Sequence, residues 1–149
     1  MIGRIAHVGV TVSDIDSSII FYRDVVGLKF EGEITMQGKE TDILFGGENV
    51  VARVAYLNGG NNIITPPVEL ICFESGTMRD RADLNKTSIS EICFETDDIM
   101  REYKRMKSLG VEFLSEPQDF DFTKDGFGKS KAVYFRDTNG IILELMQYI

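Results

Sequence analysis

The sequence is short of positive charge: its 149 residues include 16 Lys and Arg against 24 Asp and Glu, a net charge of -8. Binding to nucleic acid or to an anionic membrane needs clustered Lys and Arg, so this balance argues against both kinds of partner. Long apolar runs are also missing, since none approaches the roughly 18 residues that a membrane-spanning helix requires. We therefore expect a cytoplasmic protein whose partners include neither nucleic acid nor membrane.

Histidine and cysteine are scarce. His7 is the single histidine, and Cys72 and Cys93 are the two cysteines. The cysteines stand inside apolar segments without the spacing of a metal site, so we expect buried, reduced thiols. By length the chain is one compact domain, residues 1–149.

The chain reads as one unit written twice. Three segments of the first half match three of the second half in the same order: 5–15 on 89–99, 27–30 on 110–113, and 68–71 on 143–146. We therefore divide the domain into a first module at 1–74, a polar linker at 75–88 and a second module at 89–149.

Each module has the pattern of a strand, a helix and three strands. In the first module the alternating strand 4–12 precedes a helix that begins after Asp14 and ends at Gly27, and strands follow at 28–35, 50–58 and 67–74. The second module repeats this order with strand 89–96, helix 98–109 and strands 111–115, 131–136 and 141–148. An Asn139-Gly140 hairpin joins its last two strands, and residues 116–130 form a long loop, either a binding lid or a hairpin connection. The fold class is α+β.

Four polar side chains interrupt these apolar strands. The duplication places His7 on Glu91, and Glu69 on Glu144. Carboxylates are depleted from strands, and a buried one without a partner is heavily penalised. A solvent-facing position explains any one of the four, but a shared divalent cation explains all of them together. The pattern therefore favours a metal site or a similar polar site.

At these residues the chain resembles the vicinal oxygen chelate superfamily, which includes glyoxalase I, methylmalonyl-CoA epimerase, bleomycin-binding proteins and extradiol dioxygenases. The likeness is carried by residues 7–15, 21–28, 68–70, 92–99 and 134–145, and glyoxalase I-like and epimerase-like members are the nearest in pattern. It implies two tandem βαβββ modules that form an open, mostly antiparallel barrel around a metal cleft. It also implies a ligand set of His7, Glu69, Glu91 and Glu144, and a homodimer.

One ligand departs from the family pattern. Enzymes of the glyoxalase or epimerase type usually have His, sometimes Gln, where this chain has Glu91. A site of three carboxylates and one imidazole is typical of hard or borderline ions, namely Mg, Mn, Fe, Co or Ni, rather than of Zn in a thiolate-type site. The ion's identity stays open, Zn included. Two alternatives to a shifted metal preference also stay open: one carboxylate has left the coordination sphere and become a base, or the site no longer binds metal. Extradiol dioxygenase chemistry uses two His ligands and is rejected, because the chain has one.

The resemblance implies a metal-dependent lyase or isomerase that acts on a small substrate with two vicinal oxygens through an enediolate. Glu144 or Glu69 would be the general base. The alternative is a non-catalytic protein of the same fold that binds a small molecule or confers resistance to one. Arg53, Lys129 and Lys131 could pair with an anionic group of the ligand, but a solvated surface position is at least as good an explanation for each.

Overall fold

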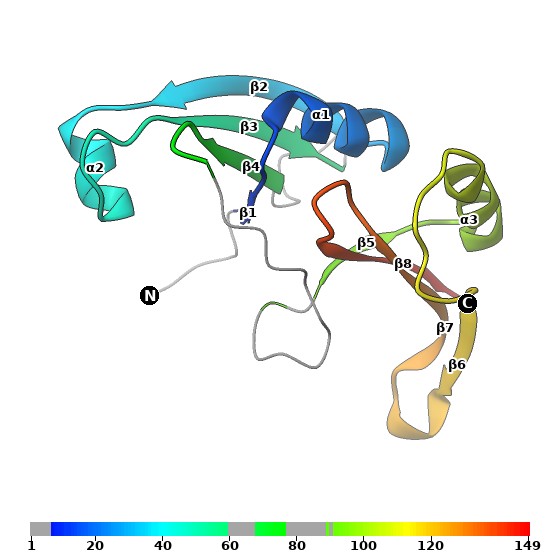
Figure 1. Ribbon diagram of the computed structural model, residues 1–149. Helices are drawn as coiled ribbons and strands as arrows, with labels where there is room; N and C mark the ends of the chain where they lie inside the picture. Colours follow the sequence, from blue (N-terminus) through cyan, green and yellow to red (C-terminus); the bar gives the residue numbers. More distant parts are fainter. Residues whose placement is uncertain (1–6, 60–67, 77–88, 90) are drawn as a thin grey trace. The chain divides into compact units, whose positions relative to one another are not determined.

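The computed structural model describes residues 7–59, 68–76, 89 and 91–149 (Figure 1). The chain divides between residues 79 and 80 into two compact units. This division falls within the expected linker at 75–88, most of which lies outside the described residues. The single domain and the exact module bounds therefore stay predictions, and we refer below to the first and the second unit.

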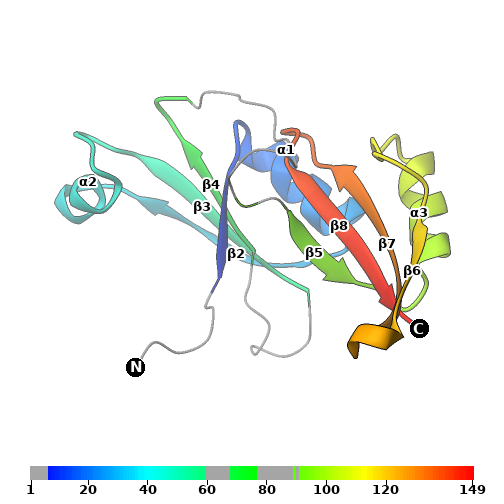
Figure 2. The same cartoon turned by 90° about the horizontal axis from the view of Figure 1, so that it is seen from below.

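The first unit contains a four-stranded sheet in the order β1-β4-β3-β2 (Figure 2). Its strands are β1 (Val8–Thr11), β2 (Lys29–Met36), β3 (Ala52–Asn58) and β4 (Val68–Phe73). β1 and β4 pair in parallel, whereas β4, β3 and β2 pair antiparallel. The parallel pair brings the first and last strands of the unit side by side.

Helix α1 (Ile15–Ile20) begins where the sequence predicts. The Asp14 carboxylate accepts a hydrogen bond from the Ser17 amide at 2.8 Å and so caps the first turn. The helix continues as the π-helical turn η1 (Phe21–Val25), and Gly27, at a φ of 91°, ends it. Tyr22 is fully buried against the sheet together with apolar side chains of α1.

Helix α2 (Lys39–Phe45) joins β2 to β3, where the sequence predicts no helix between the strands at 28–35 and 50–58. Gly46 ends the helix at a φ of 68°. The Asp42 carboxylate fixes the return of the chain, because it accepts a 2.7 Å hydrogen bond from the Val50 amide. The ring of Phe45 meets Phe73 of β4 edge-on at 5.2 Å between centroids.

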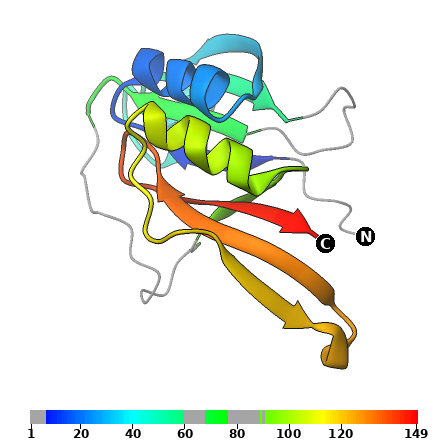
Figure 3. The same cartoon turned by 90° about the vertical axis from the view of Figure 1, so that its right-hand side faces the viewer.

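The second unit repeats the sheet in the order β5-β8-β7-β6 (Figure 3). Its strands are β5 (Ile92–Glu95), β6 (Gln118–Phe122), β7 (Gly128–Arg136) and β8 (Ile142–Tyr148), and the 3-10 turn η2 (Thr123–Asp125) joins β6 to β7. β5 and β8 are again the parallel pair. The order and directions of the strands thus match those of the first unit.

Helix α3 (Ile99–Ser108) covers one face of this second sheet (Figure 3). Asp98 caps it by accepting a 3.0 Å hydrogen bond from the Arg101 amide. Its Tyr103 packs edge-on against Phe113, which in turn contacts the fully buried Phe135 of β7. These rings form the core between helix and sheet.

The predicted hairpin between β7 and β8 is present. Its carboxylate, Asp137, is buried and accepts 2.8 Å hydrogen bonds from the amides of Asn139 and Ile141. Of the Asn139-Gly140 pair, the glycine adopts a positive φ, at 83°. This is the geometry of a type I turn followed by a left-handed residue.

The prediction of a strand at 111–115 and a loop at 116–130 is wrong. Residues 111–115 contribute one isolated bridge, between Phe113 and Phe135, and the regular strand is β6. Five positions separate Phe113 from Gln118, but three separate their partners Phe135 and Ala132. The two extra residues, next to Pro117, interrupt the edge strand.

The α+β fold with two equivalent modules is confirmed, and the open barrel around a metal cleft stays a prediction. Among the described residues, no helix has the length and apolar character to span a membrane.

Candidate functional site

The internal repeat holds at the level of strand register. Gly9 of β1 pairs with Glu69 of β4, and Cys93 of β5 pairs with Glu144 of β8. The two glutamates therefore occupy the same position on the last strand of each sheet, next to the parallel first strand. The sequence alignment predicts this equivalence, and the register confirms it.

In the first unit, two of the predicted ligands meet. Nε2 of His7 lies 3.3 Å from Oε2 of Glu69, and the His7 side chain is 48% exposed against 12% for Glu69. A Cβ added to Gly9 would lie 3.6 Å from the same Oε2. An imidazole nitrogen and a carboxylate oxygen are thus presented side by side at one end of the sheet.

In the second unit, Glu144 is buried at 8% exposure. Burial, and next the charge of Glu91, raise the pKa of the Glu144 carboxyl. In the part of the chain that the structure describes, no Lys, Arg or His side chain forms an ion pair with Glu144. Two neighbouring carboxylates without a cationic side chain are a natural place for a bound cation or for a shared proton.

Cys93 occupies in the second unit the position that Gly9 holds in the first. Desolvation and then a hydrogen bond to Glu144 raise the pKa of its thiol to about 12. Cys93 and Cys72 are both free thiols, but Cys93 is exposed and Cys72 is half-buried. The prediction of two buried thiols is therefore wrong: Cys93 stands on the edge strand β5, where one flank of its backbone has no neighbouring strand, and its residue is exposed.

A tyrosine stands beside each glutamate, and the sequence analysis missed both. Tyr56 of β3 is in register with Glu69, and Tyr134 of β7 with Glu144. Burial and then a hydrogen bond to Glu69 raise the pKa of the Tyr56 phenol. Burial and then the charges of Glu144 and Glu91 raise the pKa of Tyr134. Extending the repeat to residues 52–56 and 130–134, each ending in tyrosine, would have found them.

Arg53 is not part of this site. It lies three positions before Tyr56 on β3, so its side chain is on the opposite face of the sheet. There its guanidinium donates hydrogen bonds to Asp16 at 2.8 Å and to Glu33 at 2.6 Å. The role considered for Arg53 in anion binding is therefore wrong.

Lys129 and Lys131 also have partners on the surface. Each lies 3.2 Å from an aspartate of the neighbouring strand β6, Asp121 and Asp119 respectively. They alternate with the site-facing positions of β7, so they lie on the opposite face from Tyr134 and Glu144. The surface explanation fits both lysines.

The four candidate ligands, one imidazole and three carboxylates, are chemical groups that bind divalent cations. Within the described residues, no group of three or more His, Cys, Asp or Glu side chains is arranged to hold a metal ion. Each unit brings together its own half of the set, His7 with Glu69 and Glu91 near Glu144. A coordination sphere of all four needs both units and stays a prediction.

A model of the Glyoxalase/Bleomycin resistance protein/Dioxygenase superfamily matches residues 4–145. The chain belongs to this superfamily. Solved structures agree on the fold. A glyoxalase family protein from Bacillus cereus is similar with a TM-score of 0.83 and 22% identity, covering 100% of this chain and 96% of that one.

Two further structures of this fold have different descriptions. Glyoxalase I from Leishmania major has a TM-score of 0.68 and 19% identity, with 97% and 86% of the two chains covered. The antibiotic-binding protein TnmS3 from Streptomyces sp. has a TM-score of 0.63 and 16% identity, with 99% and 98% covered. At these identities the likeness shows the fold, and the superfamily includes both enzymes and binding proteins.

Proposed function

We propose that this superfamily member is a metal-dependent lyase or isomerase of the glyoxalase or epimerase type. The observation that carries the proposal is the repetition of Glu69 and Glu144 at one register in both sheets. His7 lies 3.3 Å from Glu69, and the charge of Glu91 acts on Glu144. Unrelated surface residues have no reason to repeat in this way. The proposed substrate is small and carries two vicinal oxygens.

The four side chains would hold one divalent cation. Such a cation would act as a Lewis acid and stabilise negative charge that develops on two adjacent substrate oxygens. Glu69 and Glu144 are the candidate bases, since each presents a carboxylate on the face where the substrate would bind. The proton would move from the substrate carbon to one carboxylate oxygen and return from it.

The neighbouring side chains would position these carboxylates. The hydroxyl of Tyr56 donates to Glu69, and the thiol of Cys93 donates to Glu144. Each donor occupies one lone pair of a carboxylate and so restricts its rotation. The carboxylates are thereby oriented before a ligand arrives, which is what efficient proton transfer requires.

A non-catalytic binder is the second candidate, and Glu91 is the observation that favours it. Family enzymes of the glyoxalase type usually have His at this position, and one neighbour of this fold is described as antibiotic-binding. In a binder the same face would hold a ligand without moving a proton. The homodimer and the cytoplasmic location also remain predictions.

The test separates enzyme from binder. The protein is purified without chelator, its metal content is measured, and Mg²⁺, Mn²⁺, Fe²⁺, Co²⁺, Ni²⁺ or Zn²⁺ is added. Thermal stabilisation and turnover of the methylglyoxal–thiol adduct are then recorded, with epimerisation of an acyl thioester as a second assay. Metal-dependent turnover supports the enzyme, whereas ligand stabilisation without turnover in either assay contradicts it.

A further inference from the structure

The free end of the β6–β7 hairpin carries a group of aromatic side chains. Phe120 and Phe122 lie on one face of β6, and their rings are stacked at 5.8 Å between centroids with 12° between their planes. Tyr148 of β8 shares this face, since it is in register with Ser130 of β7, and Ser130 with Phe120. Phe127 stands just before β7, and its amide donates a 3.1 Å hydrogen bond to the carbonyl of Phe122. We call Phe120, Phe122, Phe127 and Tyr148 the aromatic patch.

The aromatic patch is open to solvent. Phe127 is 80% exposed, Tyr148 63%, Phe122 46% and Phe120 41%. The hairpin extends beyond the part of the sheet that α3 covers (Figure 3). Four large apolar side chains in one place are more than the scattered exposed residues of an ordinary surface, and such a patch is typical of an interaction site.

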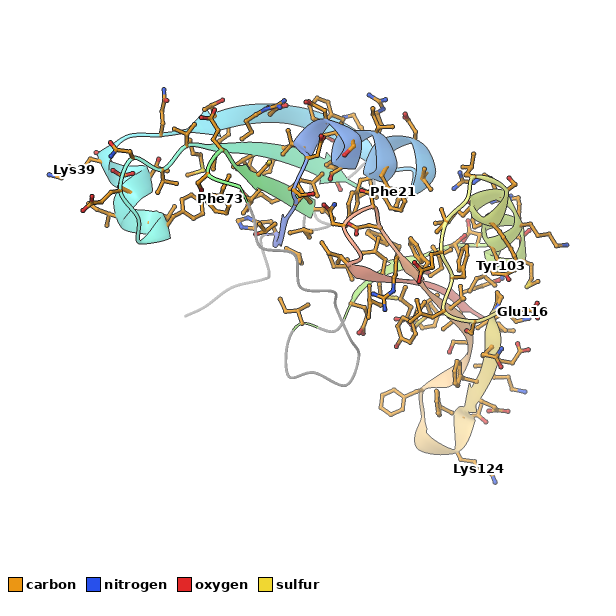
Figure 4. The ribbon with its side chains drawn as sticks, viewed as in Figure 1. Phe21, Lys39, Phe73, Tyr103, Glu116 and Lys124 are labelled. Carbon is orange, nitrogen blue, oxygen red and sulfur yellow. The ribbon has the colours of Figure 1, made fainter. Side chains whose placement is uncertain are left out.

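The first unit has an aromatic ring at the equivalent place, and there the chain itself covers it. Phe73 follows Glu69 by four positions, as Tyr148 follows Glu144. Phe45 of α2 packs edge-on against Phe73 at 5.2 Å (Figure 4 shows Phe73 beside α2). In the second unit the connection between the second and third strands is the short turn η2 in place of a helix. A cover for the rings of the second unit therefore has to come from elsewhere.

The charged side chains of the hairpin strands lie on the opposite face from the stacked rings. Lys129 and Lys131 of β7 lie 3.2 Å from Asp121 and Asp119 of β6, so these charges are paired within the hairpin. Toward the free end, the described positions of β6, β7 and β8 on the face of Phe120 are all uncharged. Two molecules with a net charge of -8 each repel one another, and this repulsion is weakest where the approaching faces carry no charge.

The edge of β6 is less suited to association than its face. Two β6 strands paired antiparallel about Phe120 would place Asp119 of one copy opposite Asp121 of the other. Like charges directly opposite one another destabilise a strand pair, and charged side chains are a common protection of edge strands. The partner is therefore expected on the aromatic face.

We propose that the aromatic patch docks face to face on the aromatic patch of a second copy of this chain. Such a contact uses the same surface on both copies, as a two-fold symmetric dimer requires. The inference is independent of the proposed function. Tyr148 lies four strand positions, about 13 Å, beyond Glu144, so the partner covers the patch and leaves Glu144 accessible.

The area of the patch fits this partner. A standard interface takes roughly 800 Å² from each protein, of which about 56–65%, or roughly 450–520 Å², is apolar. An aromatic side chain offers roughly 150–250 Å² when fully exposed, so the four partly exposed rings offer roughly 350–550 Å². The other exposed apolar pair, Ile43 and Leu44 of α2, has two aliphatic side chains at 72% and 69% exposure. That pair is too small to supply the same share.

Sedimentation equilibrium of the full chain over a dilution series tests the proposal. We expect a dimer at tens of micromolar, and a dimer Kd at least roughly tenfold higher in Phe120→Ser/Phe122→Ser, because buried aromatic side chains dominate interface energies. The matched control is Ile43→Ser/Leu44→Ser, which removes exposed apolar side chains from α2 and should keep the wild-type Kd. A monomeric wild type, or a wild-type Kd in the phenylalanine variant, overturns the proposal.

A fluorescent reporter keeps the test decisive if the serine substitutions disturb the hairpin. The chain has no tryptophan, so Phe122→Trp places a single indole in the aromatic patch, and Ile43→Trp places one on α2. The emission of Phe122→Trp should shift to shorter wavelength as the dimer forms, while that of Ile43→Trp should stay constant. A shift in Ile43→Trp alone would place the second copy at α2. Emission of Phe122→Trp that is blue-shifted at every concentration would show a cover from the same chain, and either result contradicts the proposal.

Salt gives an independent readout of the same surface. Since the aromatic patch is uncharged and each copy has a net charge of -8, added NaCl should screen the repulsion between copies and lower the dimer Kd. A Kd that rises with NaCl would indicate an interface held by opposite charges and would overturn the proposal.

Discussion

The two units share strand order and register but differ around the glutamate of their last strand. In the first, Glu69 has His7 beside it, Gly9 opposite, and a distal aromatic ring covered by α2. In the second, Glu144 has Glu91 nearby and Cys93 opposite, and its distal rings are exposed. The same framework is present in both units. The side chains around the glutamate differ between them, and so does the segment that joins the second and third strands, which is α2 in the first unit and η2 in the second.

This contrast assigns different tasks to two copies of one scaffold. The first unit has the one imidazole of the described residues, that of His7, and the ring of Phe73 at the far end of its sheet is covered by Phe45 of α2. The second supplies two carboxylates and an open aromatic end. A substitution in one unit can therefore be compared with the equivalent substitution in the other.

The largest effect should come from the two glutamates. Removing a general base costs typically about 10²–10⁴-fold in turnover, so one of Glu144→Gln and Glu69→Gln should lose turnover on that scale. Both should also lose thermal stabilisation by metal, because both are proposed ligands. The control is Glu74→Gln, which changes an exposed carboxylate just beyond β4. Wild-type turnover in both glutamine variants would remove the carboxylates from the mechanism.

The cores of the two units offer a second pair. Phe135 and Leu57 are equivalent in the repeat, and both are fully buried. Phe135→Ala should lower the free energy of unfolding by about 3–5 kcal/mol, and Leu57→Ala by about 2–5 kcal/mol, because each leaves a cavity. Urea unfolding followed by circular dichroism measures both. A change within about 0.5 kcal/mol, typical of a surface substitution, would show that the residue is not in a packed core.

Much of this framework could be predicted from the sequence, because it depends on local patterns. The starts of α1 and α3 are marked by Asp14 and by the pair Asp97-Asp98, and the structure has Asp14 and Asp98 as the caps. These caps need no distant residue. The equivalence of Glu69 and Glu144 follows from the repeat. Parts that depend on tertiary contacts were harder to predict.

Helix α2 is one such part, since seven residues between glycines look like a turn until the contact between Phe45 and Phe73 is known. Strand β6 is another. Its alternation of Asp and Phe was visible in the sequence, but its exposed residues gave no apolar run. The edge strand is interrupted near Pro117, and in the first unit β2 has a bulge after the equivalent Phe30. Such an irregularity cannot be placed without the neighbouring strand.

Glu91 gives a third prediction, intermediate in size. Glu91→Gln removes a charge but keeps an oxygen donor, so metal affinity should weaken without being lost. Glu91→His restores the usual family ligand and should shift preference toward Zn²⁺ or Ni²⁺, which imidazole suits better than a third carboxylate. Competition titrations against a metal indicator measure this order. Identical titrations for wild type and both variants would favour the non-metal binder.

The smallest effect concerns Arg53, which has no role in the proposed site. Its hydrogen bond lowers the pKa of Asp16 below the ordinary value of 3.8. The stability that the folded protein gains from the bond between Arg53 and the ionised Asp16 is therefore present above pH 3.8. It is lost as the pH falls through the lower pKa that Asp16 has in the folded state. The difference in unfolding free energy between wild type and Arg53→Gln should be small and constant from pH 7 to 5, and should shrink below about pH 4. A difference that grows on acidification would contradict this account.

The central claim is that the two ligand pairs, one from each unit, form a single site. Calorimetric titration with Mn²⁺ tests it most directly, using wild type, His7→Ala from the first unit and Glu144→Gln from the second. We predict one ion per chain for wild type, and at least roughly tenfold weaker binding in either variant, since both remove a ligand of the same ion. Two ions per chain, no binding, or weakening by one variant alone would contradict the account.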